Sequence, residues 1–267
     1  MYTFDEKKVT KELLIWLKEW FQNNGKGCNA IIGISGGKDS TIAAALCVAA
    51  IGKERVIGIM MPNGEQKDIS DSIRVCQHLD IRNITINIKD TVDTEIKLLL
   101  EGVKALGKDK LTEQTLINLP ARIRMATLYG VGQTMNGRVI NTCNLSEDWI
   151  GYSTRYGDSA GDVSPLANLT VDEVRKVGIE LGLPYDLVYK TPSDGLCGKT
   201  DEDNLGFTYA TLDKYLRTGI CDDPEIQALI DKKHMQNKFK LELMPSYKHG
   251  KVLAKVRWYY ENRYLYW

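Results

Sequence analysis

The sequence predicts an α/β fold, in which an open parallel sheet carries helices on both faces. Short apolar runs that suit buried strands alternate along the chain with amphipathic stretches that suit helices. Such alternation is typical of right-handed βαβ units, whose strands run parallel beneath covering helices. Glycine- and aspartate-rich loops at 151–165 and 190–206 add to the prediction, because ligands bind at strand-end loops in sheets of this kind.

Each expected element follows from a local pattern. Residues 7–22 place apolar side chains on one helical stripe, opposite lysines and glutamates. Residues 40–52 are alanine-rich, which suits a helix packed closely on a sheet, and residues 66–79 are amphipathic. The apolar runs expected to form strands are residues 29–35, 55–62, 83–88 and 137–143.

Helical patterns continue after the third strand to about Met135, with an interruption at 106–110. A later helix begins with a capping box formed by Thr170 and Glu173 and stops at Gly182. The alternation therefore extends over much of the chain, and the sequence shows no internal repeat, coiled coil or low-complexity tract.

The composition weighs against several functional classes. The 267 residues carry 35 basic and 35 acidic side chains, so no net charge attracts nucleic acid or anionic lipid. The six cysteines form no CxxC pair, and the three histidines lack metal-ligand spacing. The N-terminus does not resemble a signal peptide, and no apolar run approaches the ~20 residues that span a bilayer. We expect a cytoplasmic protein with reduced thiols and neither nucleic acid nor membrane as partner.

A glycine pair and an acid stand where the first strand gives way to a helix, in the string SGGKDS at 35–40. Gly36 and Gly37 allow a turn with positive φ that leaves backbone N–H groups facing open space. The helix that begins near Asp39 adds its N-terminal amides and dipole, which favours a phosphate or pyrophosphate. Asp39 would repel a bare phosphate, so its presence indicates an intervening cation, most simply Mg²⁺. The alternative is a tight turn in which Asp39 only caps the helix.

The string is not a Walker A loop, because Asp39 follows Lys38 where that motif needs serine or threonine. It resembles the pyrophosphate loop of the N-type ATP pyrophosphatases, which cleave ATP between the α and β phosphates. NAD, GMP, asparagine and tRNA-lysidine synthetases belong to this superfamily. The resemblance implies a Rossmann-like fold of the adenine-nucleotide alpha-hydrolase type, and the loop alone does not choose among the members.

Three further stretches resemble the NAD synthetases in particular. NLPARIRM at 118–125 is similar to their N-x-x-A-R-x-R-M helix. Residues 141–166 resemble their strand-to-helix segment with an acid and a G-D-x-x-x-D loop, and residues 191–216 resemble their P-[ST]-x-x-L…[ST]-D-E-x-x-L-G stretch. The matches follow the family's order along the chain, and their joint occurrence carries the resemblance.

The residues themselves support a metal site. Glu147 follows the strand expected at 138–142, so it should lie at the same sheet edge as Asp39. Carboxylates from two strand ends can share one Mg²⁺ that bridges ATP phosphates. The alternative is a solvated helix N-terminus, where Glu147 and Asp148 only answer the helix dipole.

Two further pairs leave their roles open. Arg122 and Arg124 are two residues apart, so a helix sends them to different faces, one free for a dinucleotide phosphate and the other for a structural contact. Asp158 and Asp162 lie four apart in a glycine-rich loop, where either orients a ligand or only caps a turn.

The resemblance implies a role for each matched position. ATP would be bound by Gly33, Ile34, Ser35, Gly36, Gly37, Lys38, Asp39, Ser40, Thr142 and Ser193. Deamido-NAD⁺ would be bound by Arg122, Arg155, Asp162, Phe239 and Lys240. Asp39 and Glu147 would hold Mg²⁺ and act in catalysis, and Asp158 falls on the aspartate thought to receive or deprotonate ammonia.

Two departures from the family pattern concern substrate binding. Val171 stands where many members have a lysine, so Lys199 or Lys190 would have to supply that charge. Phe239 precedes Lys240 where many members have histidine and lysine. Lys240 would keep the phosphate contact, whereas Phe239 offers only stacking.

The implied reaction transfers AMP from ATP onto the nicotinate carboxylate of deamido-NAD⁺, and ammonia then displaces AMP to give NAD⁺. Glutamine-using relatives carry an additional glutaminase domain. The synthetase-like segments begin within ~30 residues of the first residue, so we expect one NAD synthetase domain over 1–267, with ammonia as the nitrogen source. Family members are homodimers, and the helical stretch 112–135 is the expected subunit interface.

Two other functions stay open. The chain could be another SGGxDS ATP pyrophosphatase, such as a tRNA-modifying ligase, but balanced charge and the absence of CxxC pairs weigh against this. It could also be a nucleotide sensor without chemistry. A sensor would be expected to lack the two metal carboxylates, yet Asp39 and Glu147 are both present.

Overall fold

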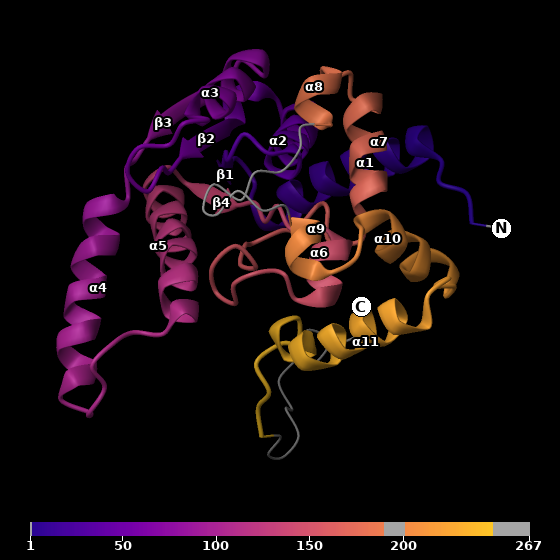
Figure 1. Cartoon of the computed structure of the whole chain (residues 1–267). Helices are drawn as coiled ribbons and strands as arrows, with labels where there is room; N and C mark the ends of the chain where they lie inside the picture. The colour runs from indigo at the N-terminus through magenta and orange to yellow at the C-terminus, as the bar shows by residue number, and fades with distance from the viewer. Residues whose placement is uncertain (1, 190–200, 248–267) are drawn as a thin grey trace.

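The computed structural model of the chain describes residues 2–189 and 201–247. Four parallel strands form one sheet in the order β3-β2-β1-β4, and helices lie over both of its faces (Figure 1). The strands are β1 Asn29–Gly33, β2 Val56–Met60, β3 Arg82–Thr85 and β4 Gly137–Val139. The predicted α/β fold with an open parallel sheet is confirmed.

The helices include every one that the sequence predicts. Thr170 and Glu173 form the predicted capping box, in which the Thr170 N–H donates to Glu173 Oε2 at 2.9 Å. The helices are α1 Glu6–Asn24, α2 Lys38–Ile51, α3 Ile69–His78, α4 Lys89–Lys104, α5 Glu113–Thr134, α6 Leu145–Ile150, α7 Val171–Glu180, α8 Tyr185–Val188, α9 Asp201–Leu205, α10 Tyr209–Thr218 and α11 Pro224–Asn237, with 3-10 turns η1 Lys53–Arg55 and η2 Lys238–Lys240.

Strand β1 lies inside the sheet and contributes side chains to a core on each face. Ala30 and Ile32 pack in a cluster that α1, α2 and α7 cover. Ile31 points to the opposite face, into a cluster with side chains of α4 and α5. Burial on both faces explains why the β1 sequence is continuously apolar instead of alternating.

All four strands are shorter than predicted, and two of them, β3 and β4, lie at the edges of the sheet. Strand β3 ends at Thr85, and its residues are exposed at the edge of the sheet. Strand β4 ends at Val139, and at its outer edge the Asp162 carboxylate accepts the Val139 N–H at 2.7 Å. Ile140 then forms a single parallel bridge with Val163, so the chain after α6 returns along the end of β4.

A third cluster lies away from the sheet and goes beyond the predicted elements. Helices α9, α10 and α11 pack against α6 and the start of α7, as Figure 1 shows at the orange and yellow end of the described chain. The cluster includes the buried residues Ile150, Val171, Leu205, Leu212 and Ile230. These helices therefore support the loop and helix that follow β4.

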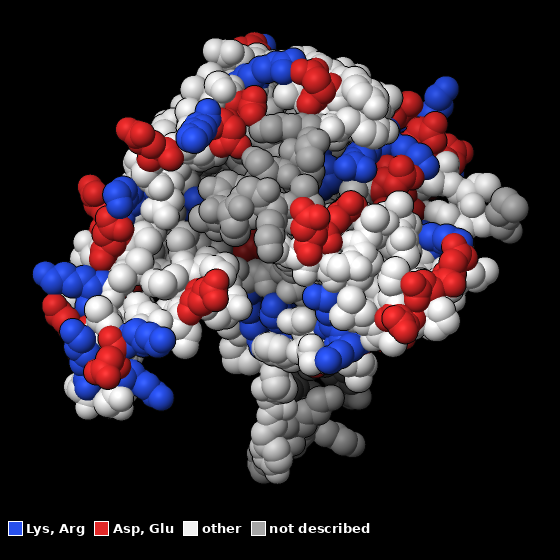
Figure 2. All heavy atoms as spheres, viewed as in Figure 1, with Lys and Arg blue, Asp and Glu red and all other residues white. Residues whose placement is uncertain are grey.

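The surface carries both signs of charge. Figure 2 shows acidic and basic side chains interspersed over the face in view. None of the helices within the described residues is long and apolar enough to cross a bilayer. The balanced composition thus has a mixed distribution on this face.

Candidate active site

The SGGKDS loop joins β1 to α2 and requires glycine at one position. Gly36 has a φ of +79°, and a Cβ atom there would lie 3.0 Å from the Ser72 backbone nitrogen. Gly37 has a φ of −82° and is the N-cap of α2. The predicted positive φ is therefore found at Gly36 and not at Gly37.

The serines of the loop hold its shape. The Ser35 and Ser40 hydroxyls lie 3.1 Å apart, and Ser35 Oγ accepts the Gly37 N–H at 3.2 Å. Ser40 Oγ also donates to the Gly37 carbonyl at 3.1 Å. Helix α2 starts at Lys38, so the positive end of its dipole meets the loop. The loop and the helix start thus provide a preformed site for an anion.

Asp39 and Glu147 come from different strand ends and meet around one lysine. Asp39 lies in the first turn of α2, and Glu147 lies in the first turn of α6. The Lys38 ammonium group is 2.6 Å from Asp39 Oδ2 and 3.9 Å from Glu147 Oε1. The two acid side chains are 18% and 17% exposed, and that of Lys38 only 5%. The structure therefore brings the two predicted metal ligands together.

Asn144, which the sequence prediction missed, connects these two carboxylates. Its side-chain Nδ2 donates to Asp39 Oδ1 at 3.1 Å, and its Oδ1 accepts the Glu147 N–H at 3.1 Å. The residue is fully buried and is the N-cap of α6 in a capping box with Glu147. The pattern of asparagine followed three residues later by glutamate is the signal that could have found it.

Burial changes the protonation of this cluster. It raises the pKa of Glu147 to about 8, with Asp39 adding to the rise and Lys38 opposing it. Burial alone would lower the pKa of Lys38, but the two carboxylates outweigh it, and the pKa is raised from its ordinary 10.5. Lys38 is therefore a charged ammonium group at neutral pH.

Asn141 fastens the loop that follows α6 to the end of β4. Its Nδ2 donates to the carbonyls of Asp158 and Ala160, at 2.7 and 3.1 Å. Its Oδ1 accepts the Cys143 N–H and the Ser164 hydroxyl, each at 2.9 Å. This side chain, which the sequence prediction also missed, fixes the position of Asp158 relative to the strand end.

Four of the five predicted substrate residues gather around the same loop, namely Arg122, Arg155, Phe239 and Lys240. The Arg155 guanidinium lies 5.1 Å from the ring centre of Tyr156 and 5.2 Å from that of Phe239. Arg122 donates from Nε to the Arg155 carbonyl at 3.3 Å. Lys240 donates to two backbone carbonyls of the loop, at 2.8 and 3.2 Å. Helix α5, the loop and η2 thus meet at one group of cationic side chains.

Arg122 and Arg124 face different surroundings, as their spacing predicts. Arg122 is exposed beside Arg155. Arg124 donates from Nε to the Met61 carbonyl at 3.0 Å, and burial lowers its pKa. Arg124 is therefore the structural member of the pair, and Arg122 is the one whose charge faces solvent.

Asp158 lies in the same loop, exposed to solvent. Its Oδ1 accepts the Thr154 N–H at 2.9 Å. The surrounding protein nevertheless raises its pKa by desolvation, against the effect of this hydrogen bond and of Lys240. Asp148 in the first turn of α6 also has a raised pKa, about 7, through burial and the charge of Asp158. The two acids thus influence each other near the loop.

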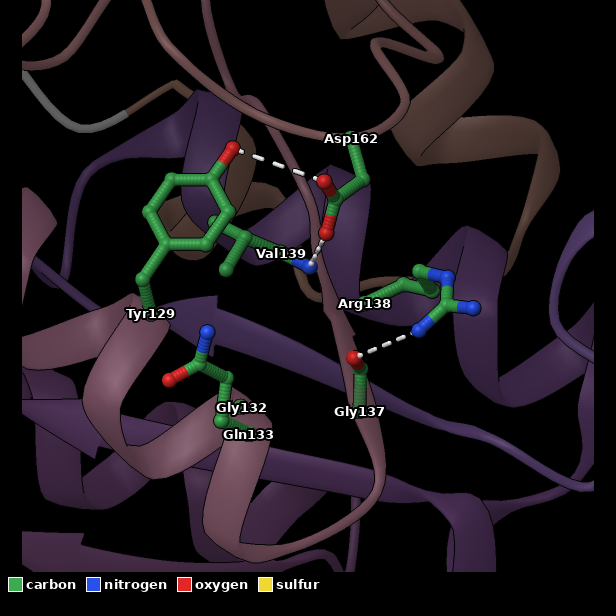
Figure 3. Close-up of a pocket in the computed structure, with 7 residues that line it drawn as sticks. All are labelled: Tyr129, Gly132, Gln133, Gly137, Arg138, Val139 and Asp162. Carbon is green, nitrogen blue, oxygen red and sulfur yellow. Dashed lines mark hydrogen bonds between the residues drawn. The ribbon is translucent and has the colours of Figure 1, made fainter.

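Asp162 lies apart, at the outer edge of β4. Figure 3 shows its carboxylate between the Val139 backbone N–H and the Tyr129 hydroxyl. The distances are 2.7 Å to Val139 and 3.5 Å to Tyr129. These residues border a cavity of about 210 Å³, which is lined by Tyr129, Gly132, Gln133, Gly137, Arg138, Val139 and Asp162. Asp162 therefore both binds the outer edge of the strand and faces a cavity.

The remaining predicted positions are accounted for as follows. Thr142 is half-buried directly after the strand bridge at Ile140. Val171 is 1% exposed in the third core cluster, so the position that carries lysine in many members here serves packing. The predicted ATP contact Ser193 and the two replacement lysines lie outside the described residues.

Comparison with known proteins decides the family. The NAD synthase family model matches residues 9–251. An NH3-dependent NAD⁺ synthetase of Pyrococcus furiosus is 40% identical over 212 residues, which cover 79% of this chain and 77% of that protein. This chain belongs to the NAD synthase family. Membership confirms the predicted ligase and the prediction of NAD⁺ synthesis, and neither a tRNA-modifying ligase nor a sensor is favoured.

Solved structures of NAD synthases share the fold. An NH3-dependent NAD synthetase from Campylobacter jejuni superposes with a TM-score of 0.72 at 29% identity, over 92% of this chain and 100% of that one. A protein named NMN synthetase, from Francisella tularensis, superposes with a TM-score of 0.81 at 31% identity, with the same coverage. The predicted Rossmann-like fold is confirmed by these similarities.

Proposed function

We propose that this chain makes NAD⁺ from deamido-NAD⁺, ATP and free ammonia, with Asp39 and Glu147 holding one Mg²⁺. The observation that supports this most directly is that the two carboxylates lie close together beside the SGGKDS loop. The loop and the start of α2 favour phosphates, whereas the two acids favour a cation. Both preferences are met at once by a metal-bound triphosphate.

The donor set fits magnesium. Mg²⁺ in proteins is held by one or two carboxylates together with substrate phosphates. In the part of the chain that the structure describes, no group of three or more His, Cys, Asp or Glu side chains is placed to hold a metal by itself. Asp39 and Glu147 would therefore share the ion with the nucleotide, and the bound ion would neutralise charge on the pyrophosphate.

The chain's own groups assist the first step by binding charge. A carboxylate does not acylate ammonia directly, because oxide is a poor leaving group. Attack of the nicotinate oxygen on the α phosphate joins AMP to the carboxylate and breaks the bond to pyrophosphate. The backbone amides of Ser35–Ser40 and the dipole of α2 would stabilise the charge on that leaving group.

The cationic group beside the 151–165 loop is the proposed site for the acyl substrate. Arg122 and Arg155 would bind its phosphates, and Lys240 keeps the loop in place through two carbonyl contacts. Phe239 flanks Arg155. At the cavity near β4, the Asp162 carboxylate would accept a hydrogen bond from a hydroxyl group of the substrate. These contacts would orient the nicotinate toward the nucleotide.

Asp158 is the proposed acceptor of a proton from ammonium. Ammonia is mostly ammonium at neutral pH, so it must lose a proton before it attacks. A carboxylate with a raised pKa both attracts the cation and accepts its proton. Ammonia then adds to the acyl carbon, the added nitrogen loses a further proton to solvent, the bond to AMP breaks, and the amide of NAD⁺ remains.

The name of the Francisella relative favours one further candidate substrate. That protein is named NMN synthetase and superposes over 92% of this chain. The same chemistry on a mononucleotide would need the site at Arg155 and not the cavity at Asp162. The two substrates differ only by the adenylate half, so a direct comparison separates them.

The deciding experiment identifies the products by mass spectrometry. Purified chain is incubated with ATP, Mg²⁺ and ammonium, together with deamido-NAD⁺ or with nicotinate mononucleotide. We expect AMP, pyrophosphate and NAD⁺, with the larger kcat/KM for the dinucleotide. Release of ADP would overturn the mechanism, and a larger kcat/KM for the mononucleotide would replace the substrate.

Ammonia as the nitrogen donor has its own test. The proposal that residues 1–267 act as one NAD synthetase domain that uses free ammonia predicts activity with ammonium salts alone. Glutamine in ammonia-free buffer should give no NAD⁺. Equal activity with glutamine would contradict the proposal.

We further propose a homodimer that uses the surface of α5. Leu116 and Ile117 are 43% and 51% exposed near the start of this helix, and Leu98 of the adjacent α4 is 55% exposed. Exposed apolar side chains on neighbouring helices suit a subunit contact. Sedimentation at micromolar concentration should give the dimer mass, and an active monomer would contradict the proposal.

The proposed location is the cytoplasm. Five cysteines within the described residues are free thiols, and four of these are buried. Proteins that keep thiols unpaired are typical of reducing compartments. Cell fractionation with a tagged chain tests this, because recovery from an oxidising compartment would contradict it.

A further inference from the structure

Lys38 is the most buried cation of the active site, and its ammonium group contacts both proposed metal ligands. Only 5% of its side chain is exposed. The ammonium nitrogen lies 2.6 Å from Asp39 Oδ2 and 3.9 Å from Glu147 Oε1. A lysine is seldom this buried unless carboxylates pair with it. The side chain is thus directed at the acids and away from solvent.

Asn144 donates hydrogen bonds to the carboxylate oxygens of Asp39 and Glu147 that Lys38 does not contact. Its Nδ2 donates to Asp39 Oδ1 at 3.1 Å, and its backbone N–H donates to Glu147 Oε2 at 3.5 Å. The oxygens on the side of Lys38 are Asp39 Oδ2 and Glu147 Oε1. An ion that bridges the carboxylates opposite Asn144 must use the same oxygens that Lys38 contacts.

The net charge of the cluster disfavours binding of a divalent ion when no nucleotide is bound. With Glu147 ionised, the two carboxylates and the ammonium group leave a single negative charge, and with Glu147 protonated they leave none. In either case a divalent ion would make the cluster positive and would lie close to the ammonium group in a poorly hydrated site, where charges interact strongly. Nucleotide phosphates bring enough negative charge to hold both cations.

We propose that Lys38 is an internal counter-ion that competes with the divalent metal for Asp39 and Glu147, so that the metal binds together with the nucleotide and not before it. The inference rests on the proposed function, because it takes the two acids as metal ligands. Lys38 is a positioning residue in this role. Without nucleotide, the Lys38 ammonium group stays paired with the two carboxylates. When the nucleotide binds, its phosphates attract the ammonium group, and the carboxylates become available to the metal.

The test measures binding of Mn²⁺, which reports on the Mg²⁺ site through the electron paramagnetic resonance signal of the free ion. Wild-type chain should bind Mn²⁺ weakly by itself. When α,β-methylene-ATP is present, the wild-type chain should bind Mn²⁺ at least about tenfold more tightly than the analogue binds Mn²⁺ without protein. Lys38→Met should bind Mn²⁺ without nucleotide about tenfold more tightly than wild type, because the competing charge is gone.

Two control variants isolate the position and the charge. Lys89→Met removes a lysine from an exposed ion pair with Asp93, and Mn²⁺ binding should stay at the wild-type level. Lys38→Arg keeps the positive charge and should keep the weak binding. Lys38→Met combined with Glu147→Gln should lose the gained affinity, which would place the gain at the two carboxylates.

The outcomes separate this inference from the proposed function. A folded Lys38→Met chain that binds Mn²⁺ no more tightly than wild type overturns the inference alone. If that variant does not fold, the wild-type chain supplies the test. Mn²⁺ binding to wild type that is equally tight with and without the analogue also overturns the inference. If Mn²⁺ with the analogue does not bind to wild type at all, or Glu147→Gln leaves that binding unchanged, the metal site itself is wrong.

Discussion

The Asn144 side chain donates to Asp39 across 105 residues of sequence, at 3.1 Å. The same side chain accepts the Glu147 N–H, also at 3.1 Å, and so begins helix α6. One buried amide therefore sets the position of both carboxylates that the proposed mechanism needs. It does so through fixed hydrogen bonds from a helix start, which leaves little freedom for either acid.

We predict that Asn144→Ala lowers kcat/KM by about tenfold to a hundredfold, since Asp39 loses its fixed partner. The free energy of unfolding should fall by about 1 kcal/mol, because the cap of α6 is lost. Steady-state kinetics and urea unfolding measure the two effects. The control is Asp5→Ala, which removes the N-cap side chain of α1. Asp5 accepts the Lys8 N–H and is far from α6 in the sequence. It should reduce stability similarly and leave kcat/KM unchanged, and equal effects of both variants on kcat/KM would contradict the role of Asn144.

A second prediction concerns the glycine of the phosphate loop. Gly36→Ala places a Cβ atom 3.0 Å from Asp71 Cβ and from the Ser72 nitrogen, at a φ of +79°. We expect a loss of about 1–3 kcal/mol in unfolding free energy and a strong loss of ATP binding, because the loop must move. Urea unfolding and calorimetric titration with ATP measure these.

Gly27 supplies a matched control for that substitution. Its φ is +76°, and a Cβ atom there meets nothing within 4 Å. Gly27→Ala therefore carries the backbone strain without the collision, and it lies before β1 instead of after it. ATP binding that falls equally in Gly27→Ala and Gly36→Ala would show that strain alone, and not the collision at the loop, is responsible.

The parts of the fold that were predictable depend on neighbouring residues. The run that becomes β1 is apolar because Ile31 and Ile32 face two different cores, and the turn after it needs glycine at position 36. Both signals are local in the sequence. The Thr170 cap of α7 is local in the same way, since it depends on a glutamate three residues on.

The parts that were missed depend on contacts between distant segments. The Asp162 carboxylate that accepts the Val139 N–H at the edge of β4 comes from a distant segment, and nothing near Val139 announces that hydrogen bond. The pairing of Asn144 with Asp39 joins two strand ends that only the sheet order brings together. The approach of the Lys38 ammonium group to Glu147, in a distant segment, likewise follows from packing and not from spacing.

A third prediction uses the raised pKa of Asp148. Burial raises this pKa from its ordinary 3.8 to about 7, with a contribution from Asp158. Between those values the folded chain keeps a proton that the unfolded chain has released. The free energy of unfolding therefore falls as the pH rises through this window, by at most about 1.4 kcal/mol per pH unit.

Asp148→Asn removes that proton exchange. Relative to wild type, the variant should gain stability as the pH rises from 4 to 7, and the difference should level off above pH 7. Urea unfolding at intervals of one pH unit measures the difference. Asp109→Asn changes an exposed acid between α4 and α5 and is the control. A difference between Asp148→Asn and wild type that does not vary with pH would contradict the burial of this acid.

The last prediction concerns the contact of Arg155 with Phe239, where many family members have histidine at the second position. The guanidinium lies 5.2 Å from the Phe239 ring centre and 5.1 Å from that of Tyr156. Tyr156 has a φ of 63°, which is rare for a large side chain, so the loop holds this ring in place at some expense in stability. The two rings confine a cation that would otherwise move freely in solvent.

We therefore expect Phe239→Ala to raise KM for the acyl substrate about twofold to fivefold and to leave KM for ATP unchanged, because a partly exposed cation–π contact contributes about 0.5–1 kcal/mol. Phe239→Tyr retains a ring and should keep KM near the wild-type value. In a double-mutant cycle, Arg155→Ala and Phe239→Ala should then be less than additive in their effects on KM, since both remove the same contact. Strict additivity would mean that Phe239 meets the substrate independently of Arg155, and a rise in KM for ATP would mean that it acts on the nucleotide site instead.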